Sequence, residues 1–462
     1  MTGMPELPRA ALRLIEVLEG AGGEAWVVGG WVRDALRGAP DHDVDVCCSL
    51  RWQQTKAACE AAGIAVHETG TAHGTVTCVS DGMSIEVTTF RVEGTYSDMR
   101  HPDSVAFVED VREDLARRDL TINAMAYHPC RGLLDPYGGQ DDLAAGVIRC
   151  VGDPATRFGE DALRVLRAVR FACRLGFVVE PATQAALDAA APTLSAIAPE
   201  RIGAELDGIL ASGRLSWAML HERPAMAAAV PELAALVGFG QRSVYHIYDV
   251  YEHTAQVAGA LEAFSGGCAP SCLRWAALLH DVGKPSCFTV DDEGRGHFYG
   301  HPAKGARMAE AALRRMAVPG EVARPACALV AMHDLPFGPA APQVRRALAR
   351  LDRACPGQAL PLMHELLLLK RADALGKAPS CFPYVAELDR IEAAVRAERR
   401  RGPVVGVRDL AIGGADVMRA AGIGPGREVG RLLAAVLDEV VAGKVGNDPE
   451  SLMAYVRSLA LR

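Results

Sequence analysis

The chain has 462 residues, half of them hydrophobic, and a formal net charge of −8. This length exceeds a single hydrophobic core and predicts two to four domains. No run of about 18 uncharged apolar residues occurs, so no transmembrane helix is indicated, and the N-terminus lacks the pattern of a signal peptide. The acidic charge excludes an evenly basic surface, so any RNA would bind a local basic stripe.

The cysteines number thirteen, are scattered along the chain and include no CxxC pair. This pattern predicts reduced thiols in a cytoplasmic protein and argues against zinc bound by cysteine. Abundant alanine and leucine predict a mostly helical chain.

The first 145 residues predict a small mixed β-sheet with short helices, which we call the head. Strands are expected at residues 25–30, 43–48, 74–79 and 84–89, and helices at residues 8–18 and 51–62. Asp81-Gly82, between the last two strands, is typical of a tight hairpin. The polar, turn-rich residues 90–103 predict a mobile loop. From residue 146 onward the pattern is helical almost throughout.

An apolar strand runs into a glycine pair at residues 27–34, which read VVGGWVRD. Gly29 and Gly30 would let backbone N–H groups approach a triphosphate at the start of a helix. Arg33, one turn further on, could clamp a phosphate through two hydrogen bonds. The alternative is an ordinary Gly-Gly loop.

Two carboxylates follow, at Asp43 and Asp45. In a strand, residues i and i+2 share a face, with Cα atoms roughly 6.6 Å apart, so both could converge on one divalent ion or on two ions that share ligands. Oxygen ligands suit Mg²⁺, which takes its other ligands from water and phosphate. Glu86, on a later strand, is either a third ligand or a solvent-facing residue. The alternative for the aspartates is a solvated acidic turn.

Residues 160–170, EDALRVLRAVR, predict an amphipathic helix. At about 100° per residue, apolar side chains gather on one face, namely Ala162, Val165, Leu166, Val169, Ala172 and Cys173. The opposite face carries the arginines at positions 164, 167, 170 and 174. Gly159 would give a flexible start, and Glu160 and Asp161 would be first-turn acids that favour the helix dipole. The alternative is a surface helix with a solvated arginine stripe.

A third motif, RRDLTIN at residues 117–123, follows the glycine pair and the two aspartates. In this order the motifs resemble the nucleotidyltransferase family of class II CCA-adding enzymes and bacterial poly(A) polymerases, most strongly over residues 20–240. The resemblance implies an α+β fold, with a mixed-sheet head followed by an all-helical neck, body, HD domain and tail. It also implies template-independent addition of C, C and A to the 3′ end of tRNA from CTP and ATP, with release of pyrophosphate and two-metal catalysis.

The resemblance gives roles to the head residues. The catalytic metal ligands, for Mg²⁺, would be Asp43 and Asp45. The triphosphate would be bound by Gly29, Gly30, Arg33 and Arg118. Asp119 and Asn123 would orient the ribose and the loop between head and neck, or act as helix N-caps, or do both.

The resemblance also identifies EDxxRxxR, at residues 160–167, as the nucleotide-selecting motif. Cytosine and adenine each present an exocyclic amine beside an unprotonated ring nitrogen, so Asp161 would accept from the amine and Arg164 would donate to the nitrogen. Uracil and guanine reverse this pattern, and each good bidentate contact discriminates by about 1–3 kcal/mol. Arg167 and Arg170 would fix Arg164 or contact the triphosphate.

Two alternatives remain open. One is an A-adding or poly(A) polymerase relative, because the head motifs do not separate these activities from CCA addition. Residues 89–102 resemble the family's intact flexible loop, which disfavours CC-only addition, and residues 199–206 match its neck motif, expected to stabilise a helix. The other alternative is a phosphohydrolase with a non-catalytic head.

A second set of motifs lies at residues 251–254, 278–285 and 371–374 and resembles the HD-domain metal-dependent phosphohydrolases. The resemblance implies His253, His280, Asp281 and Asp373 as ligands of a divalent or transition metal ion. Because His280 and Asp281 are adjacent, a distorted or terminating helix must aim both inward. His301 and His333 stand where related domains supply extra ligands, and their role stays open. Such a site would hydrolyse phosphomonoesters or 2′,3′-cyclic phosphates at RNA ends.

The expected domains are the head at 1–145, a helical nucleobase-selecting and RNA-binding neck at 146–240, the HD domain at 241–395 and a helical tRNA-binding tail at 396–462. Glycine-rich motifs at 409–414 and 422–430 resemble the family's C-terminal region, although plain helix connections would also explain them. By resemblance, body and tail would grip tRNA by shape and backbone. The expected partners are tRNA, CTP and ATP, with no membrane and no obligate protein partner.

Overall fold

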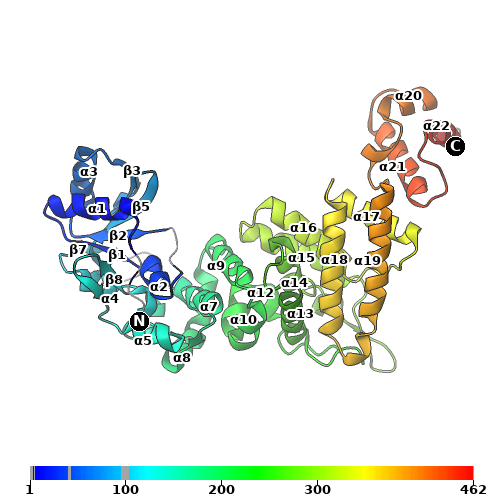
Figure 1. The fold of residues 1–462 in the computed structure, drawn as a ribbon. Helices are drawn as coiled ribbons and strands as arrows, with labels where there is room; N and C mark the ends of the chain where they lie inside the picture. Colours follow the sequence, from blue (N-terminus) through cyan, green and yellow to red (C-terminus); the bar gives the residue numbers. More distant parts are fainter. Residues whose placement is uncertain (1–3, 5, 40–42, 95–103, 461–462) are drawn as a thin grey trace. The chain divides into compact units, whose positions relative to one another are not determined.

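The computed structural model describes residues 4, 6–39, 43–94 and 104–460. The chain forms two compact units, Met1–Leu206 and Asp207–Arg462 (Figure 1). The first unit combines a β-sheet with helices, and the second is almost entirely helical. The predicted α+β fold, with a mixed-sheet head and helical remainder, is confirmed.

A seven-stranded sheet in the order β3-β4-β5-β2-β1-β8-β9 forms the centre of the first unit. Its strands are β1 (Ala25–Val28), β2 (Asp45–Cys48), β3 (Ala65–Gly70), β4 (Thr75–Ser80), β5 (Met83–Thr89), β8 (Ala126–His128) and β9 (Gly132–Leu134). β2 pairs with β1 antiparallel and with β5 parallel, so the sheet is mixed. The predicted hairpin between β4 and β5 is present, with Asp81 at φ 46° and Gly82 at φ 79°.

The apolar face of the sheet is covered by α1 (Arg9–Gly20) and α3 (Trp52–Ala61). Val44 and Val46 point into this core, whereas the alternate residues Asp43 and Asp45 are exposed. This two-residue alternation is the reason that both aspartates reach the same face of the sheet.

Helices and short strand pairs complete the first unit. The helices are α2 (Gly30–Leu36), α4 (Val111–Ala116), α5 (Gly139–Ala145), α6 (Pro154–Glu160), α7 (Leu163–Leu175), α8 (Pro181–Ala190) and α9 (Pro199–Ala211), and the short strands are β6 (Arg91–Glu93), β7 (Val105–Phe107), β10 (Val147–Ile148) and β11 (Val178–Val179). The prediction of a loop from residue 90 is wrong at β6, which pairs with β7. Residues 95–103 of that loop lie outside the described residues.

The predicted helix over residues 160–170 is two helices. α6 ends at Glu160, Asp161 has an extended backbone (φ −136°, ψ 107°), and α7 begins at Leu163. The expectation that Glu160 and Asp161 start one helix is therefore wrong, because Glu160 is the last residue of α6 and Asp161 lies in the extended connection before α7. The predicted faces of α7 are confirmed: its apolar positions are buried.

The second unit consists of helices and one β-hairpin. The helices are α10 (Leu215–His221), α11 (Arg223–Ala229), α12 (Pro231–Ala234), α13 (Val250–Ser265), α14 (Ser271–Leu279), α15 (His301–Arg315), α16 (Gly320–Met332), α17 (Ala341–Ala354), α18 (Ala359–Leu375), α19 (Tyr384–Arg401), α20 (Gly414–Ala421), α21 (Arg427–Val441) and α22 (Pro449–Ala460), and the hairpin pairs β12 (Thr289–Val290) with β13 (Gly296–His297). α18 packs against α13, α14, α16, α17 and α19. The last three helices share a second hydrophobic core, which also includes Ala349 of α17 and the segment before α20.

All thirteen cysteines are free thiols, and four of them lie in or beside the core of the head: Cys47, Cys48, Cys59 and Cys78. The sulfur atoms of Cys59 and Cys78 are 3.7 Å apart. Burial raises the pKa of Cys48 to about 11, so this thiol stays protonated at neutral pH. In the part of the chain that the structure describes, no helix is long and apolar enough to cross a bilayer.

Candidate active site

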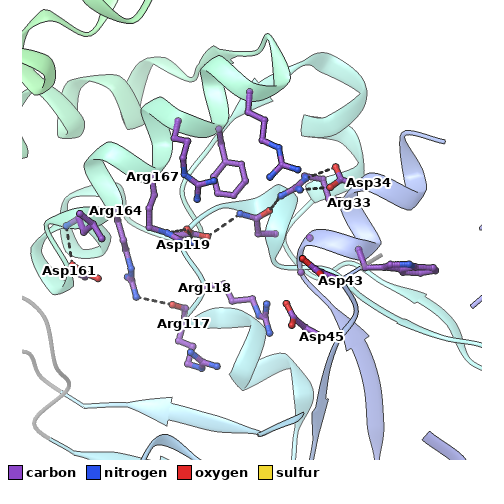
Figure 2. A pocket seen from close by; sticks show the side chains of 18 of the residues that line it. Arg33, Asp34, Asp43, Asp45, Arg117, Arg118, Asp119, Asp161, Arg164 and Arg167 are labelled. Atoms are coloured by element: carbon purple, nitrogen blue, oxygen red, sulfur yellow. Dashed lines mark hydrogen bonds and ion pairs between the residues drawn. The ribbon is translucent and has the colours of Figure 1, made fainter. Parts of the chain in front are cut away.

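A cavity of about 650 Å³ in the first unit gathers the residues that the sequence predicts for nucleotide binding. Figure 2 shows side chains from α2, β2, the segment after α4 and α7 facing this space. The predicted residues that line it are Gly29, Gly30, Arg33, Asp43, Asp45, Arg118, Asp119, Asn123, Asp161, Arg164, Arg167 and Arg170. Segments far apart in the sequence thus share one cavity with a strongly basic lining.

Asp43 and Asp45 form the acidic part of this lining. Partial removal from water inside the cavity, together with the negative charges of Glu86 and Asp43, raises the pKa of Asp45, and the charge of Arg118 opposes the shift. Negative groups that repel one another in a cavity are suited to a divalent cation. Glu86 lies beside Asp45 in the sheet register but does not line the cavity. Its role as a third ligand stays a prediction.

Gly29, the residue before α2, leaves space for the side chain of Arg118. Its φ is 73°, and a Cβ there would lie 3.2 Å from Nη1 of Arg118 and 4.0 Å from Oδ2 of Asp45. The absence of a side chain thus lets Arg118 lie between the glycine turn and the aspartate. Nη2 of Arg118 donates to Asp114 at 3.3 Å, while its buried Nε has no hydrogen-bond partner among the residues that the structure describes. Arg118 is therefore placed to bind an anion beside Asp45.

Arg33 is buried and held by its neighbours. Its Nε and Nη2 donate to the carboxylate of Asp34 at 3.0 and 2.6 Å, and its Nη1 donates to Oδ1 of Asn123 at 2.7 Å. The guanidinium also lies 5.0 Å from the ring centre of Phe171. The fork that the sequence predicts for a phosphate thus binds Asp34 here, and Arg33 ties α2 to the RRDLTIN segment.

Asp119 connects that segment to α7. Its Oδ2 lies 2.7 Å from the guanidinium of Arg167, and its Oδ1 accepts from the N–H of Leu120 at 2.8 Å. Burial opposes ionisation, but the charge and hydrogen bond of Arg167 outweigh it and lower the pKa of Asp119 to about 2. The N-cap interpretation is wrong: the short 3₁₀ helix η2 (Thr121–Asn123) has, within the described segment, no side-chain cap.

We expect Asp119→Asn to destabilise the protein by roughly 2 kcal/mol at neutral pH. The carboxylate has a lowered pKa in the folded protein, so its stabilising effect is complete above pH 4 and is lost as pH falls from about 4 towards about 2. Urea unfolding at pH 7 and pH 2.5 measures the change. Asp141→Asn, at an exposed position of α5, is the control. An equal difference between the Asp119→Asn variant and the parent at both pH values would contradict the ion-pair account.

Asp161 and Arg164, the predicted base-reading pair, each have other partners. Oδ1 of Asp161 accepts from the N–H of Leu163 at 3.0 Å, and its Oδ2 accepts from Nη2 of Arg201 at 3.1 Å. Arg164 pairs with Glu160 and donates to the carbonyl of Arg117 at 3.2 Å (Figure 2). Both side chains line the cavity.

Arg201 is a cavity residue that sequence reasoning missed. The resemblance of its segment to the family's neck motif predicts only a helix-stabilising role. Four residues further along α9, Glu205 accepts from Nε of Arg170 at 2.6 Å. Two ion pairs one helical turn apart therefore join α9 to Asp161 and to α7. In the sequence, Arg201 and Glu205 at positions i and i+4 are the pattern that indicates such paired contacts from one face of a helix.

The second unit contains a separate cluster of potential metal ligands. His253, His280 and Asp281 form one group, and Asp281, His301 and His333 form another, and in each group the ligand atoms lie within 4.8 Å of one another. All of these residues are buried. In the described part of the chain, groups of three such residues occur only here. As predicted, α14 ends at Leu279, so His280 and Asp281 both point inward.

Asp281 is shared by the two groups. Its Oδ2 lies 3.4 Å from His253 and 3.2 Å from His280, and its Oδ1 lies 3.5 Å from both His301 and His333. Oδ1 has no hydrogen-bond partner among the residues that the structure describes, and Oδ2 also lies 2.7 Å from the ammonium of Lys284. A buried carboxylate whose two oxygens face four imidazole nitrogens suits metal coordination.

The groups around this cluster shift the pKa values of its ligands in different directions. Burial opposes ionisation of Asp281, but His280 and Lys284 outweigh it and hold its pKa well below the usual value. Burial lowers the pKa of His301 to about 4, so this ring is neutral at pH 7, and burial also lowers the pKa of His280. Burial opposes protonation of His253 as well, but its hydrogen bonds with Asp281 and Asp373 outweigh burial and raise its pKa. Asp373 accepts from His253 at 3.1 Å and pairs with Lys377 at 2.6 Å.

Comparison with protein-family models divides the chain into recognisable parts. Residues 25–149 match the poly A polymerase head domain, and residues 244–377 match the HD domain. Residues 176–236 match a model for the RNA- and SrmB-binding region of polymerase A, and residues 387–456 match a model for a second tRNA nucleotidyltransferase domain. The four boundaries expected from the sequence stay a prediction.

Individual relatives extend these matches. The CCA-adding enzyme of Leuconostoc mesenteroides is 44% identical over 219 residues, which is 47% of this chain and 54% of that protein. The chain thus spans about half the length of the first such relatives. The A-adding tRNA nucleotidyltransferase of Deinococcus radiodurans is 34% identical over 94% of the chain and 95% of that protein. The CCA-adding enzyme of Geobacillus stearothermophilus is 32% identical over 96% of both.

A solved structure agrees with the fold. The CCA-adding enzyme of Bacillus stearothermophilus in complex with CTP is 30% identical, with a TM-score of 0.66 over 98% of this chain and 97% of that chain. Together with the acidic pair on β2 and the glycine turn before α2, this match defines a nucleotidyltransferase with a poly(A) polymerase-type head. The chain belongs to the family of tRNA nucleotidyltransferases that contains the CCA-adding and A-adding enzymes.

Proposed function

We propose that the protein adds C, C and A to the 3′ end of tRNA, without a nucleic-acid template, from CTP and ATP in the cytoplasm. The observation that carries the proposal is the single cavity that joins the acidic pair of β2 to Asp161 and Arg164 of the selecting motif. The relatives named CCA-adding enzyme support it. Addition of A alone is the second candidate, because a relative of nearly full length is an A-adding enzyme.

The cavity residues would have separate roles in the transfer of a nucleotide to the RNA. The 3′-hydroxyl oxygen of the RNA bonds to the α-phosphorus, the bond to the bridging oxygen breaks, pyrophosphate leaves, and the hydroxyl proton passes to water. Asp43 and Asp45 would hold Mg²⁺, which lowers the pKa of the hydroxyl and neutralises the leaving group when bound. Arg118, beside the glycine turn, would bind the triphosphate.

Base selection would use the carboxylate that Arg201 now holds. The exocyclic amine of cytosine or adenine would donate to Oδ2 of Asp161, while Arg164 donates to the ring nitrogen. Arg201 can stay bound to the same oxygen, because a carboxylate accepts several hydrogen bonds at once.

We expect Asp161→Ala to lower the preference for CTP and ATP over UTP and GTP by at least about tenfold, since one base contact is worth about 1–3 kcal/mol. Single-nucleotide extension of tRNA with each triphosphate measures this preference. Asp188→Ala, on α8, is the control. Unchanged rejection of UTP and GTP would refute the selecting role of Asp161.

The overall function is tested by incubating the protein with tRNA that lacks CCA, or that ends in CC, and with each labelled nucleotide. Ordered gain of C, C and A supports the proposal. Extension restricted to A on the CC-ended tRNA identifies an A-adding enzyme, and repeated A identifies a poly(A) polymerase. If no nucleotide is added to either tRNA, the proposal is refuted and the alternative is a phosphohydrolase with a non-catalytic head.

For the HD site we propose hydrolysis of phosphomonoesters or 2′,3′-cyclic phosphates at RNA ends, with a divalent or transition metal ion held by His253, His280, Asp281 and Asp373. In this reaction a water oxygen bonds to phosphorus, the phosphorus–oxygen bond to the ribose breaks, and the ribose oxygen takes a proton. The arrangement of Asp281 between two histidine pairs supports His301 and His333 as further ligands.

A further inference from the structure

Two tyrosines at the HD cavity are unusually exposed. Tyr299 is 79% exposed and Tyr245 is 60% exposed. Both line the cavity of about 580 Å³ that also contains Asp281, His301, His333 and Asp373. Large aromatic surfaces left in solvent beside a cavity mark contact sites for ligands.

Tyr299 forms an aromatic pair with His297. Its ring stacks on the ring of His297, with centroids 5.3 Å apart and planes only 7° apart. His297 is held in turn by Asp291, whose Oδ2 lies 2.8 Å from Nε2 of the ring. Asp291 is fixed by Nε of Arg295 at 3.0 Å and by the backbone N–H of Arg295 at 2.8 Å. The orientation of the His297 ring, on which Tyr299 stacks, is therefore set by a network of hydrogen bonds.

The hairpin that carries the pair is fixed to the rest of the unit. The N–H of Gly296 donates to the carbonyl of Arg242 at 2.9 Å. A Cβ at Gly296 would lie 2.3 Å from the carbonyl oxygen of Gln241, so only glycine permits this approach. On the other side, Tyr299 precedes His301, the first residue of α15, by two positions. A fixed aromatic surface thus adjoins the candidate metal ligands.

The cavity also has groups that suit a phosphate. Lys284 lies 2.7 Å from Oδ2 of Asp281, and Lys377 lies 2.6 Å from Oδ2 of Asp373. Both ammonium groups line the same cavity as Tyr299. Cations beside candidate metal ligands, with an aromatic face at the rim, match the two halves of a nucleotide: an anionic phosphate and a flat base.

We propose that Tyr299, stacked on His297, is a nucleobase-binding surface that holds the base of a nucleotide whose phosphate faces Asp281. The proposal rests on the proposed phosphohydrolase function and adds the class of substrate, a nucleotide, and the residue that selects it. The base would stack on the face of Tyr299 turned away from His297, because the other face is covered by the His297 ring. Aromatic stacking tolerates any of the bases. The nucleotide is either free or the last residue of an RNA.

The test compares two cyclic phosphodiesters in the full-length protein supplied with Ni²⁺ or Mg²⁺: 2′,3′-cyclic AMP, which has a base, and glycerol 1,2-cyclic phosphate, which has no aromatic ring. Tyr299→Ala should lower the ratio of kcat/KM for the cyclic nucleotide to that for glycerol 1,2-cyclic phosphate by about tenfold, through a higher KM. Tyr299→Phe should keep the ratio, because the ring is retained. Val290→Ala, at an exposed position of the same hairpin, is the control for hairpin structure.

An unchanged ratio in Tyr299→Ala would overturn the proposal. If the parent protein hydrolyses no phosphoester, the phosphohydrolase function fails, and binding then decides the base site: AMP should bind more tightly than ribose 5-phosphate in calorimetry, and Tyr299→Ala should abolish the difference. Equal binding of the two probes would overturn the base site. A comparison of cyclic AMP with a short RNA that has a 2′,3′-cyclic end shows whether the site takes a free nucleotide or the last residue of an RNA. The natural substrate should have the higher kcat/KM and should lose more of it in Tyr299→Ala.

Discussion

Asp45→Asn should reduce nucleotide addition by about a thousandfold or more while leaving the protein folded. The carboxylate is placed to hold the catalytic cation, and loss of roughly 4 kcal/mol of transition-state stabilisation corresponds to this factor. In the absence of metal, Asp45→Asn should not lower the free energy of unfolding, whereas removal of one charge from a buried ion pair would lower it. Partial removal from water in the cavity and repulsion from Glu86 and Asp43 raise the pKa of Asp45, so its negative charge is less favourable in the folded protein than in the unfolded chain, and asparagine relieves the repulsion.

Two measurements check this prediction. Extension of tRNA with CTP and ATP gives the activity, and thermal unfolding with and without MgCl₂ gives the stability. The melting temperature of the metal-free protein should not fall in Asp45→Asn, and the stabilisation by Mg²⁺ should be lost or reduced. Asp110→Asn, at an exposed position of the same unit, is the control. Activity close to that of the parent would remove Asp45 from the catalytic role.

Asp281→Asn should remove metal binding from the HD site and with it the phosphohydrolase activity. One side chain faces both histidine pairs, so its loss affects both groups of ligands. It also leaves the buried Lys284 without its partner carboxylate, and breaking a buried pair costs about 3–5 kcal/mol. Lower thermal stability is therefore expected together with the loss of metal.

His301→Gln separates these two effects, because it removes one ligand and leaves the pair of Asp281 and Lys284 in place. Metal content after dialysis, measured by mass spectrometry, should fall in both proteins, whereas only Asp281→Asn should be markedly less stable. Asp292→Asn, at an exposed position, is the control. Full metal content in Asp281→Asn would contradict the site.

Much of the first site could be predicted because local patterns determine it. The two-residue alternation at Asp43 and Asp45 brings both to one face of β2, and the glycine pair marks the start of α2. The arginine stripe of α7 lines the cavity because the opposite face is apolar and buried. These features need only the periods of strands and helices.

Other features depend on contacts between distant segments. The break at Asp161 was missed because hydrophobic periodicity continues through it, and a two-residue change of backbone direction leaves no mark on that pattern. The sequence predicts that the guanidinium of Arg33 binds a phosphate, but its partner in the structure is the carboxylate of the next residue, Asp34. Arg201 was missed because its partner lies 40 positions earlier, and only the packing of α9 brings the two together.

The buried thiols of the head have a practical outcome. While the chain is folded, Cys47, Cys48, Cys59 and Cys78 are shielded from solvent, and burial keeps the pKa of Cys47 and Cys48 above the usual range, so these two react slowly with oxidants. Heating exposes all four in one flexible chain, where they can form wrong disulfides before the sheet reassembles. Recovery of activity on cooling should therefore depend on a reductant in the buffer.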